Sequence, residues 1–299
     1  MKYTEPKAEW WPQSKTSARH IARVGRICYK SAGKQPPAEL LTEEDREAFR
    51  GKRDQERCND FWKSGHKSMF RHGTAYYYIS NDKKLPPRLW ALLEASPYIN
   101  YAAQERRVWI STNMQYRLEN PDISAVLEPY SVTEAEFIHQ AVRNKFTEAL
   151  ALLRMTFVVT TQISTSRELN RTSPNAIAEQ STRYCNLEKK GGVMIAEPHW
   201  YAGGTMRQRL LFNAACRVSE WAYRRLLRSG MKPQDARGVL PLDTYTVAAY
   251  TYNISEWEQI IKLRFHGTTG APHPNAKLIC GQIRDAINAR LKEYTDYQV

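Results

Sequence analysis

The chain has 299 residues, of which 42% are hydrophobic and 25% charged, and its formal net charge is +13. No apolar run approaches the ~20 residues of a membrane-spanning helix, and the opening residues do not resemble a signal peptide. We therefore expect a soluble, cytoplasmic protein whose partners are anionic, either nucleic acid or small polyanions such as nucleotides. Five cysteines without a CxxC pair indicate reduced thiols and no metal site.

The first 80 residues predict two helices and a strand. Residues 14–31 predict a helix with an apolar stripe and with Thr16 or Ser17 as its N-cap. Residues 42–52 predict a charged surface helix, whose acidic first turn suits the helix dipole. Residues 74–80 are rich in tyrosine and alternate as a strand.

The middle of the chain, residues 81–155, carries no chemical motif. Within it we expect a strand at 107–111 and a long helix that begins behind Thr133 and ends near residue 154. We interpret this stretch as an elaborating insertion in one domain that spans residues 1–299.

The most informative stretch is residues 167–184, RELNRTSPNAIAEQSTRY, which follows a β-branched run at 155–164 that predicts a strand. Arg167 and Arg171 are four residues apart, so they share one face of a short helical turn, and the proline at 174 ends the helix.

Beyond that proline, Glu179, Ser181 and Arg183 alternate with period two. In an extended segment all three side chains would point the same way. A carboxylate, a hydroxyl and a guanidinium that converge suit a planar, partly anionic ligand, with arginine as the bidentate phosphate holder.

Residues 208–230 predict an amphipathic helix that Gly230 ends. Its apolar stripe consists of Leu211, Ala214, Val218, Trp221, Ala222 and Leu226. Because aromatic residues on such a stripe are usually core, we expect Trp221 to be buried. Farther on, Ser255 and Glu258 have the spacing of a capping box at the start of another helix.

The stretch around residue 171 resembles the signature of the flavin-dependent thymidylate synthases, Arg-His-Arg, then seven residues and Ser. Arg171 matches the first arginine and Ser181 the serine. The central histidine and the second arginine are Thr172 and Ser173 in this chain, and this difference leaves the exact nucleotide open.

Two further blocks support the resemblance. Residues 65–80 are similar to the family's Gly-His-x-Ser-x-x-Glu-His followed by an aromatic strand, with Arg71 in place of the glutamate. Residues 232–264 match a second family pattern. The matching residues in that block are Arg237, Leu240, Pro241, Thr246, Asn253, Leu263 and Arg264.

The resemblance implies roles for individual residues. Catalytic roles are implied for Arg264 and Ser181. Substrate binding is implied for Glu168, Arg171, Glu179, Ser181, Arg183, Arg237 and Arg264. Cofactor binding is implied for Ser31, His72, Thr74, Arg171, Asn253 and Gln259.

The resemblance also implies an α/β (α+β) fold with a central antiparallel sheet and flanking helices, in a homotetramer with shared active sites. The implied reaction is reductive C5 methylation of dUMP to dTMP, with FAD as cofactor and NADPH and methylenetetrahydrofolate as co-substrates. The protein supplies position and electrostatics to such a cofactor, which suits fixed arginines better than a cysteine nucleophile.

Two alternatives stay open at the level of sequence. The first is methylation or hydroxymethylation of another pyrimidine nucleotide, such as UMP or dCMP, which the residues at 172 and 173 motivate. The second is a non-catalytic, basic protein that binds nucleic acid on the same scaffold. Retention of the arginines at 171, 183, 237 and 264 together argues against it.

Overall fold

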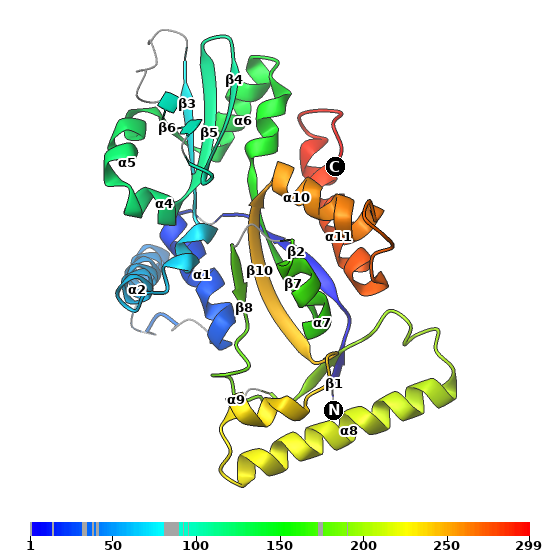
Figure 1. Ribbon diagram of the computed structural model, residues 1–299. Helices are drawn as coiled ribbons and strands as arrows, with labels where there is room; N and C mark the ends of the chain where they lie inside the picture. The colour runs from blue at the N-terminus through cyan, green and yellow to red at the C-terminus, as the bar shows by residue number, and fades with distance from the viewer. Residues whose placement is uncertain are drawn as a thin grey trace.

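The computed structural model describes residues 2–13, 15–31, 35–37, 39, 42–80, 90–91, 93–94, 96–172, 176–189 and 191–299. Within these residues, two four-stranded antiparallel sheets and one short parallel pair are combined with helices (Figure 1). The expected mixed fold, with a central antiparallel sheet and flanking helices, is thereby confirmed. Ser173 and Pro174 lie outside the described residues.

The central sheet is built on a long ladder between its two middle strands. In sheet order its strands are β2 (Lys7–Trp11), β7 (Arg154–Gln162), β10 (Tyr245–Asn253) and β8 (Ile177–Glu179). All neighbours are antiparallel. The β-branched run behind residue 155 therefore forms the predicted strand, because such side chains pack well on a pleated surface.

Helices cover both faces of this sheet. Phe157 and Val159 of β7 pack with α10 (Ile254–Ile261) and α11 (Pro274–Leu291), while Val158 between them packs on the opposite face. That opposite face is covered by α1 and α2. The alternation follows from the period of two along a strand.

The helices α1 (Ser17–Tyr29) and α2 (Glu43–Lys63) confirm both helices expected near the N-terminus. Thr16 is the N-cap of α1, and Thr42 caps α2. The helix α2 runs about 11 residues past the expected end, because Phe61 and Cys58 give it a buried edge against α1.

A second sheet lies above the first in Figure 1 and contains much of the predicted insertion. In sheet order its strands are β4 (Ile99–Gln104), β5 (Arg107–Asn113), β3 (Thr74–Ile79) and β6 (Ser131–Val132). The helices of this region are α4 (Met114–Glu119), α5 (Pro121–Leu127) and α6 (Glu134–Arg143). The expected strands at 74–80 and 107–111 are both present.

The long helix expected from Thr133 to residue 154 is wrong. It ends at Arg143, and a 3₁₀ segment (Thr147–Leu152) follows before β7 begins. Lys145 takes a left-handed conformation at φ 53°, and Phe146 N donates to Ala141 O at 2.9 Å. This is a Schellman-type ending, and it closes the helix about three turns earlier than expected.

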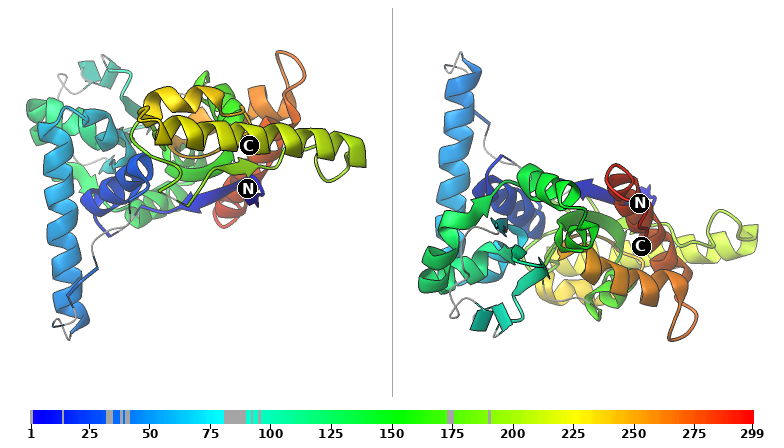
Figure 2. Two further views of the ribbon diagram at one scale, coloured as in Figure 1. Left: turned by 90° about the horizontal axis from the view of Figure 1, so that it is seen from below. Right: turned by 90° about the horizontal axis from the view of Figure 1, so that it is seen from above.

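Below the central sheet in Figure 1 lie β1 (Lys2–Thr4), which pairs with β9 (Met194–Ala196), and the helices α8 (Met206–Arg228) and α9 (Pro233–Ala236). The helix α7 (Ile163–Asn170) follows β7 and packs beside β7 and β10. Figure 2 shows α2 and α8 projecting from the body at opposite ends.

The apolar stripe predicted for α8 is not core. Trp221 is 60% exposed, and Leu211 and Val218 are each 64% exposed. The buried residues of the helix, Cys216 and Tyr223 among them, lie on a neighbouring face. The apolar period of the sequence correctly predicts a helix with an apolar face. The rest of the chain, however, packs against a different face of this helix.

The five cysteines are free thiols, as expected. No helix in the described part of the chain is long and apolar enough to span a membrane.

Candidate functional site

A cavity of about 330 Å³ lies where α7, β8 and β10 meet the turn after β8. It is lined by Ile163, Ser166, Arg167, Glu179, Gln180, Ser181, Thr182, Arg183, Arg237 and Thr246. Four of the residues predicted to bind substrate thus lie around one cavity, although Arg237 is more than 50 positions from the others in the chain.

The carboxylate of Glu179 is fixed in this cavity by hydroxyl groups. Ser166 Oγ donates to its Oε1 at 2.8 Å, and Thr246 Oγ1 donates to the same oxygen at 3.0 Å. Its other oxygen, Oε2, accepts a longer bond of 3.4 Å from Asn170 Nδ2. Oε2 therefore keeps lone pairs for a further donor.

The segment after Glu179 does not stay extended as predicted. Ser181 Oγ accepts from the backbone N–H groups of Arg183 (3.2 Å) and Tyr184 (3.4 Å), so the chain turns there. Serine hydroxyls commonly compete for neighbouring backbone donors in this way. The period-two argument is wrong beyond Gln180, yet the turn still brings Ser181 and Arg183 to the cavity.

Arg237 follows α9 and joins two parts of the site. Its Nη1 donates to Thr182 Oγ1 at 2.6 Å, and its Nε donates to Gln234 O at 3.1 Å. With Arg167 and Arg183 it gives the lining three guanidinium groups. Glu179 is the one carboxylate among the described lining residues. This balance favours an anionic ligand.

Glu168 and Arg264 face each other outside this cavity. Arg264 Nη1 lies 3.9 Å from Glu168 Oε2, and its Nε is buried without a partner among the described residues. Arg264 belongs to a π-helical turn, Lys262–His266, a conformation that is frequent at functional sites.

Arg171 is exposed at the C-terminal end of α7 and lines neither this cavity nor the next one described. The adjacent Thr172, which stands where the family signature has histidine, donates its hydroxyl to Leu169 O at 3.0 Å.

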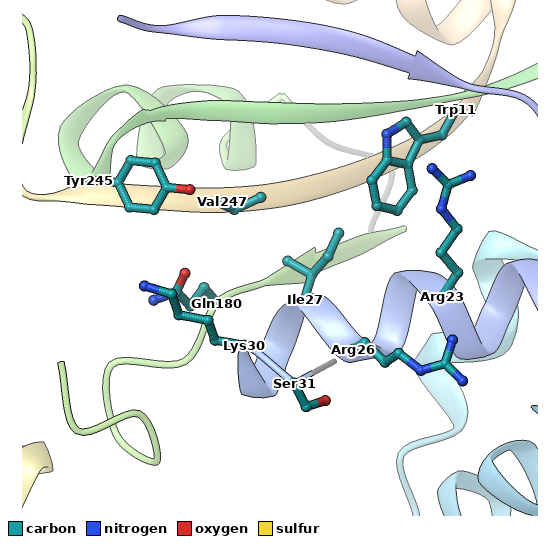
Figure 3. A pocket seen from close by; sticks show the side chains of 9 residues that line it. All are labelled: Trp11, Arg23, Arg26, Ile27, Lys30, Ser31, Gln180, Tyr245 and Val247. Carbon is teal, nitrogen blue, oxygen red and sulfur yellow. The ribbon is translucent and has the colours of Figure 1, made fainter. Parts of the chain in front are cut away.

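A second cavity of about 430 Å³ adjoins the first at Gln180, which lines both. It is lined by Trp11, Arg23, Arg26, Ile27, Lys30, Ser31, Gln180, Tyr245 and Val247 (Figure 3). Ser31, predicted to bind cofactor, lies in it at the end of α1. Arg23 lies over the Trp11 ring, 3.6 Å from its centroid, at one end of the cavity.

His72 and Thr74, also predicted to bind cofactor, are buried away from both cavities. His72 Nδ1 is 2.7 Å from Thr251 Oγ1, and burial lowers the pKa of His72 to about 3, so the ring is neutral at pH 7. Thr74 is held at its backbone N–H by Gln13 Oε1 at 2.7 Å.

Asn253 is the last residue of β10 and Gln259 lies on α10, and neither lines one of the two cavities. Asn253 is the N-cap of this helix and forms a reciprocal capping box with Glu256. The predicted capping box at Ser255 and Glu258 is therefore wrong by two residues. Gln259 is exposed.

Sequence reasoning missed several residues that line the two cavities or hold the lining residues in place. Ser166 and Asn170, which hold Glu179, are four apart on α7, a spacing that could have indicated a polar face toward the signature. Arg23 and Arg26 lie within α1, which ends two residues before Ser31, but only the pairing of β2 with β7 brings Trp11 beside them.

Comparison with known proteins gives one family match. The profile of the family described as thymidylate synthase complementing protein matches residues 98–289. A search of curated proteins gave no match.

Among solved structures, a UMP/dUMP methylase, PolB from Streptomyces cacaoi, bound with 5-Br dUMP, is similar at 25% identity and a TM-score of 0.41. The match covers 52% of this chain and 77% of that one, and the same values hold for the protein bound with 5-Br UMP. Because the family profile covers more than half of the sequence and includes the signature around Ser181, the chain belongs to the family of flavin-dependent thymidylate synthases.

Proposed function

We propose that the protein catalyses the reductive C5 methylation of dUMP to dTMP, with methylenetetrahydrofolate, FAD and NADPH. The observation that carries this proposal is the cavity in which Arg167, Arg183 and Arg237 converge around the fixed carboxylate of Glu179. Family membership supports the same chemistry.

The cavity suits both ends of a uracil nucleotide. Arg237 and Arg183 would hold the phosphate, since guanidinium groups bind phosphate bidentately. Glu179 Oε2 would accept the N3–H of the pyrimidine, because its partner oxygen already receives two hydroxyl donors. Ser181 is proposed to contact the nucleotide through the hydroxyl proton that its backbone bonds leave available.

Bound FAD would supply the carbon transfer and the hydride that this reaction needs. The cavity at Ser31 fits such a group in its donor set, since Trp11 and Tyr245 provide aromatic surface and Arg23 and Arg26 provide cations. We propose it as the place of the flavin or of part of it. His72, Thr74, Arg171, Asn253 and Gln259 stay proposals that rest on the resemblance.

A homotetramer would explain two features of the single chain. Arg264 and Glu168 lie outside the nucleotide cavity, so shared sites would allow them to serve a neighbouring copy. The exposed apolar face of α8, formed by Leu211, Val218 and Trp221, would be covered by a second copy. We propose α8 as part of the contact between copies.

Another pyrimidine nucleotide is the second candidate. Thr172 turns its hydroxyl back to Leu169 O and supplies no cation where the family signature has histidine. This motivates UMP or dCMP as alternative substrates, with a methyl or hydroxymethyl product.

The test is product formation with FAD, NADPH and methylenetetrahydrofolate, supplying dUMP, UMP or dCMP in turn. We expect dTMP from dUMP, and a roughly 10- to 100-fold loss of dUMP affinity in Arg237→Ala, because one charge-assisted bond to phosphate contributes about 1.5–3 kcal/mol. Lys52→Ala, at an exposed position of α2 that lines neither cavity, is the control. If only UMP or only dCMP gives a product, that nucleotide and not dUMP is the substrate. If no nucleotide gives a product, the protein is not a methylase.

A further inference from the structure

A cavity of about 240 Å³ that opens to solvent lies between α1 and α2, and most of its lining residues are arginines. Arg19, Arg23 and Arg26 are spaced by four and three residues, so they share one face of α1. Arg50 and Arg53 are three apart on the facing helix, α2. The two helices already pack against each other through apolar side chains, Cys58 and Phe61 among them. The five guanidinium groups around the cavity are therefore not needed for this packing and require another explanation.

Carboxylates hold these groups in place without filling the cavity. Arg26 Nη2 lies 2.6 Å from Oδ1 of Asp54, which is 4% exposed, and Arg50 Nη1 lies 2.6 Å from Glu43 Oε1. Of the described carboxylates that pair with the five arginines, Asp54 alone also lines the cavity. The wall is thus fixed and cationic.

Arg23 is the cation with the least compensation. Within the described residues it has no ion pair, and its guanidinium carbon lies over the Trp11 ring, 3.6 Å from the centroid. Burial, and then the nearby charge of Arg19, lower the pKa of Arg23, and the charge of Glu9 offsets only part of this. Burial and mutual repulsion both disfavour charge here, so an anion bound between these helices would relieve a cost that the folded chain carries.

The α1–α2 cavity adjoins the cavity at Ser31, which Figure 3 shows. Arg23 and Arg26 line both, and in Figure 3 the two side chains lie at the end of that cavity away from Tyr245. A ligand whose planar part lies between Trp11 and Tyr245 would therefore direct its other end past Arg23 and toward Arg50.

We propose that the α1–α2 cavity binds the anionic tail of a ligand whose ring occupies the cavity at Ser31. This extends the proposed function, on which the identity of the ring rests. The shared chemistry of the tail is a short chain of anionic groups. Two sources provide it, namely the pyrophosphate of a dinucleotide and the carboxylates of an oligoglutamyl folate.

The test is calorimetric binding to wild type, to the double variant Arg50→Gln/Arg53→Gln and to Lys52→Gln. Arg50 and Arg53 line the α1–α2 cavity but not the cavity at Ser31, and their exposed ion pairs contribute little to the stability of the fold. Lys52 is exposed on the same helix and lines neither, so Lys52→Gln controls for lost charge.

The probes are inorganic pyrophosphate, FAD, and methylenetetrahydrofolate with one or five glutamates. We expect pyrophosphate to bind the double variant at least tenfold more weakly than wild type, with Lys52→Gln unchanged. If FAD also binds the double variant more weakly, the tail is that of a dinucleotide. If FAD and the monoglutamate bind as in wild type and the pentaglutamate binds more weakly, the tail is that of a folate. Equal binding of every probe to all three proteins would overturn the proposal, whether or not dUMP is turned over. Loss of pyrophosphate binding in a protein that never turns over a nucleotide would leave the tail site standing and refute the methylase.

Discussion

Two amphipathic helices of this protein have similar sequence patterns and different surroundings. In α11, Ile279, Ile283 and Ile287 recur every four residues and are completely buried against the central sheet. In α8, Leu211 and Val218 are largely exposed. The apolar period of a helix therefore indicates that a face will be covered, but it does not indicate whether the same chain covers it.

The contacts of α8 explain the difference. Its inner face is held by Phe212, which packs edge-on against Trp200 with ring centroids 5.3 Å apart, and by Tyr223, whose hydroxyl accepts from Leu187 N at 3.3 Å. These contacts use the side of the helix next to the apolar stripe and leave the stripe outside. The largest expected effects on folding should accordingly come from α11, and the largest effects on assembly from α8.

Truncating one aliphatic side chain in each helix should give the largest difference in stability between α11 and α8. Ile283→Ala should lower the free energy of unfolding by about 2–5 kcal/mol, because it leaves a cavity in the core. Val218→Ala should change it by less than about 0.5 kcal/mol in the dilute single chain, because the side chain is 64% exposed. Urea unfolding at low protein concentration measures both, and similar losses in the two variants would contradict the described packing.

A charge on the outer face of α8 should have little effect on folding and a clear effect on assembly. Val218→Asp should reduce the molar mass measured by sedimentation while leaving the helical circular dichroism unchanged, since burying an unpaired carboxylate between copies is costly. Lys52→Asp introduces the same side chain at an exposed position of α2 and should leave the mass unchanged. If Val218→Asp keeps the wild-type mass, α8 is not the contact between copies.

The sequence predicted those parts of the fold whose local signals agree with their tertiary surroundings. Strand β7 is β-branched and pairs on both sides, and α1 begins at a capping threonine, Thr16, that the sequence offers. The long helix after Thr133 was predicted wrongly because no local sequence signal indicates that Lys145 adopts a left-handed backbone conformation. The capping box of α10 was displaced because Asn253, at the end of a strand, supplies the cap two residues before Ser255.

The candidate site was predictable as a set of residues but not as a geometry. Glu179, Ser181, Arg183 and Arg237 were named from the sequence, and they line one cavity. Their convergence, however, depends on a turn at Ser181 and on Arg237 bonding to Thr182, which are contacts that no spacing encodes. The arginines of the α1–α2 joint were missed because each, taken singly, resembles an ordinary surface charge.

The visible absorption spectrum of the purified protein, followed by its bleaching with NADPH in the presence and absence of dUMP, reports on both the flavin and the nucleotide site. We expect a flavin spectrum whose reduction is accelerated by dUMP in wild type and much less in Arg237→Ala. A colourless protein that also fails to take up added FAD would contradict this expectation.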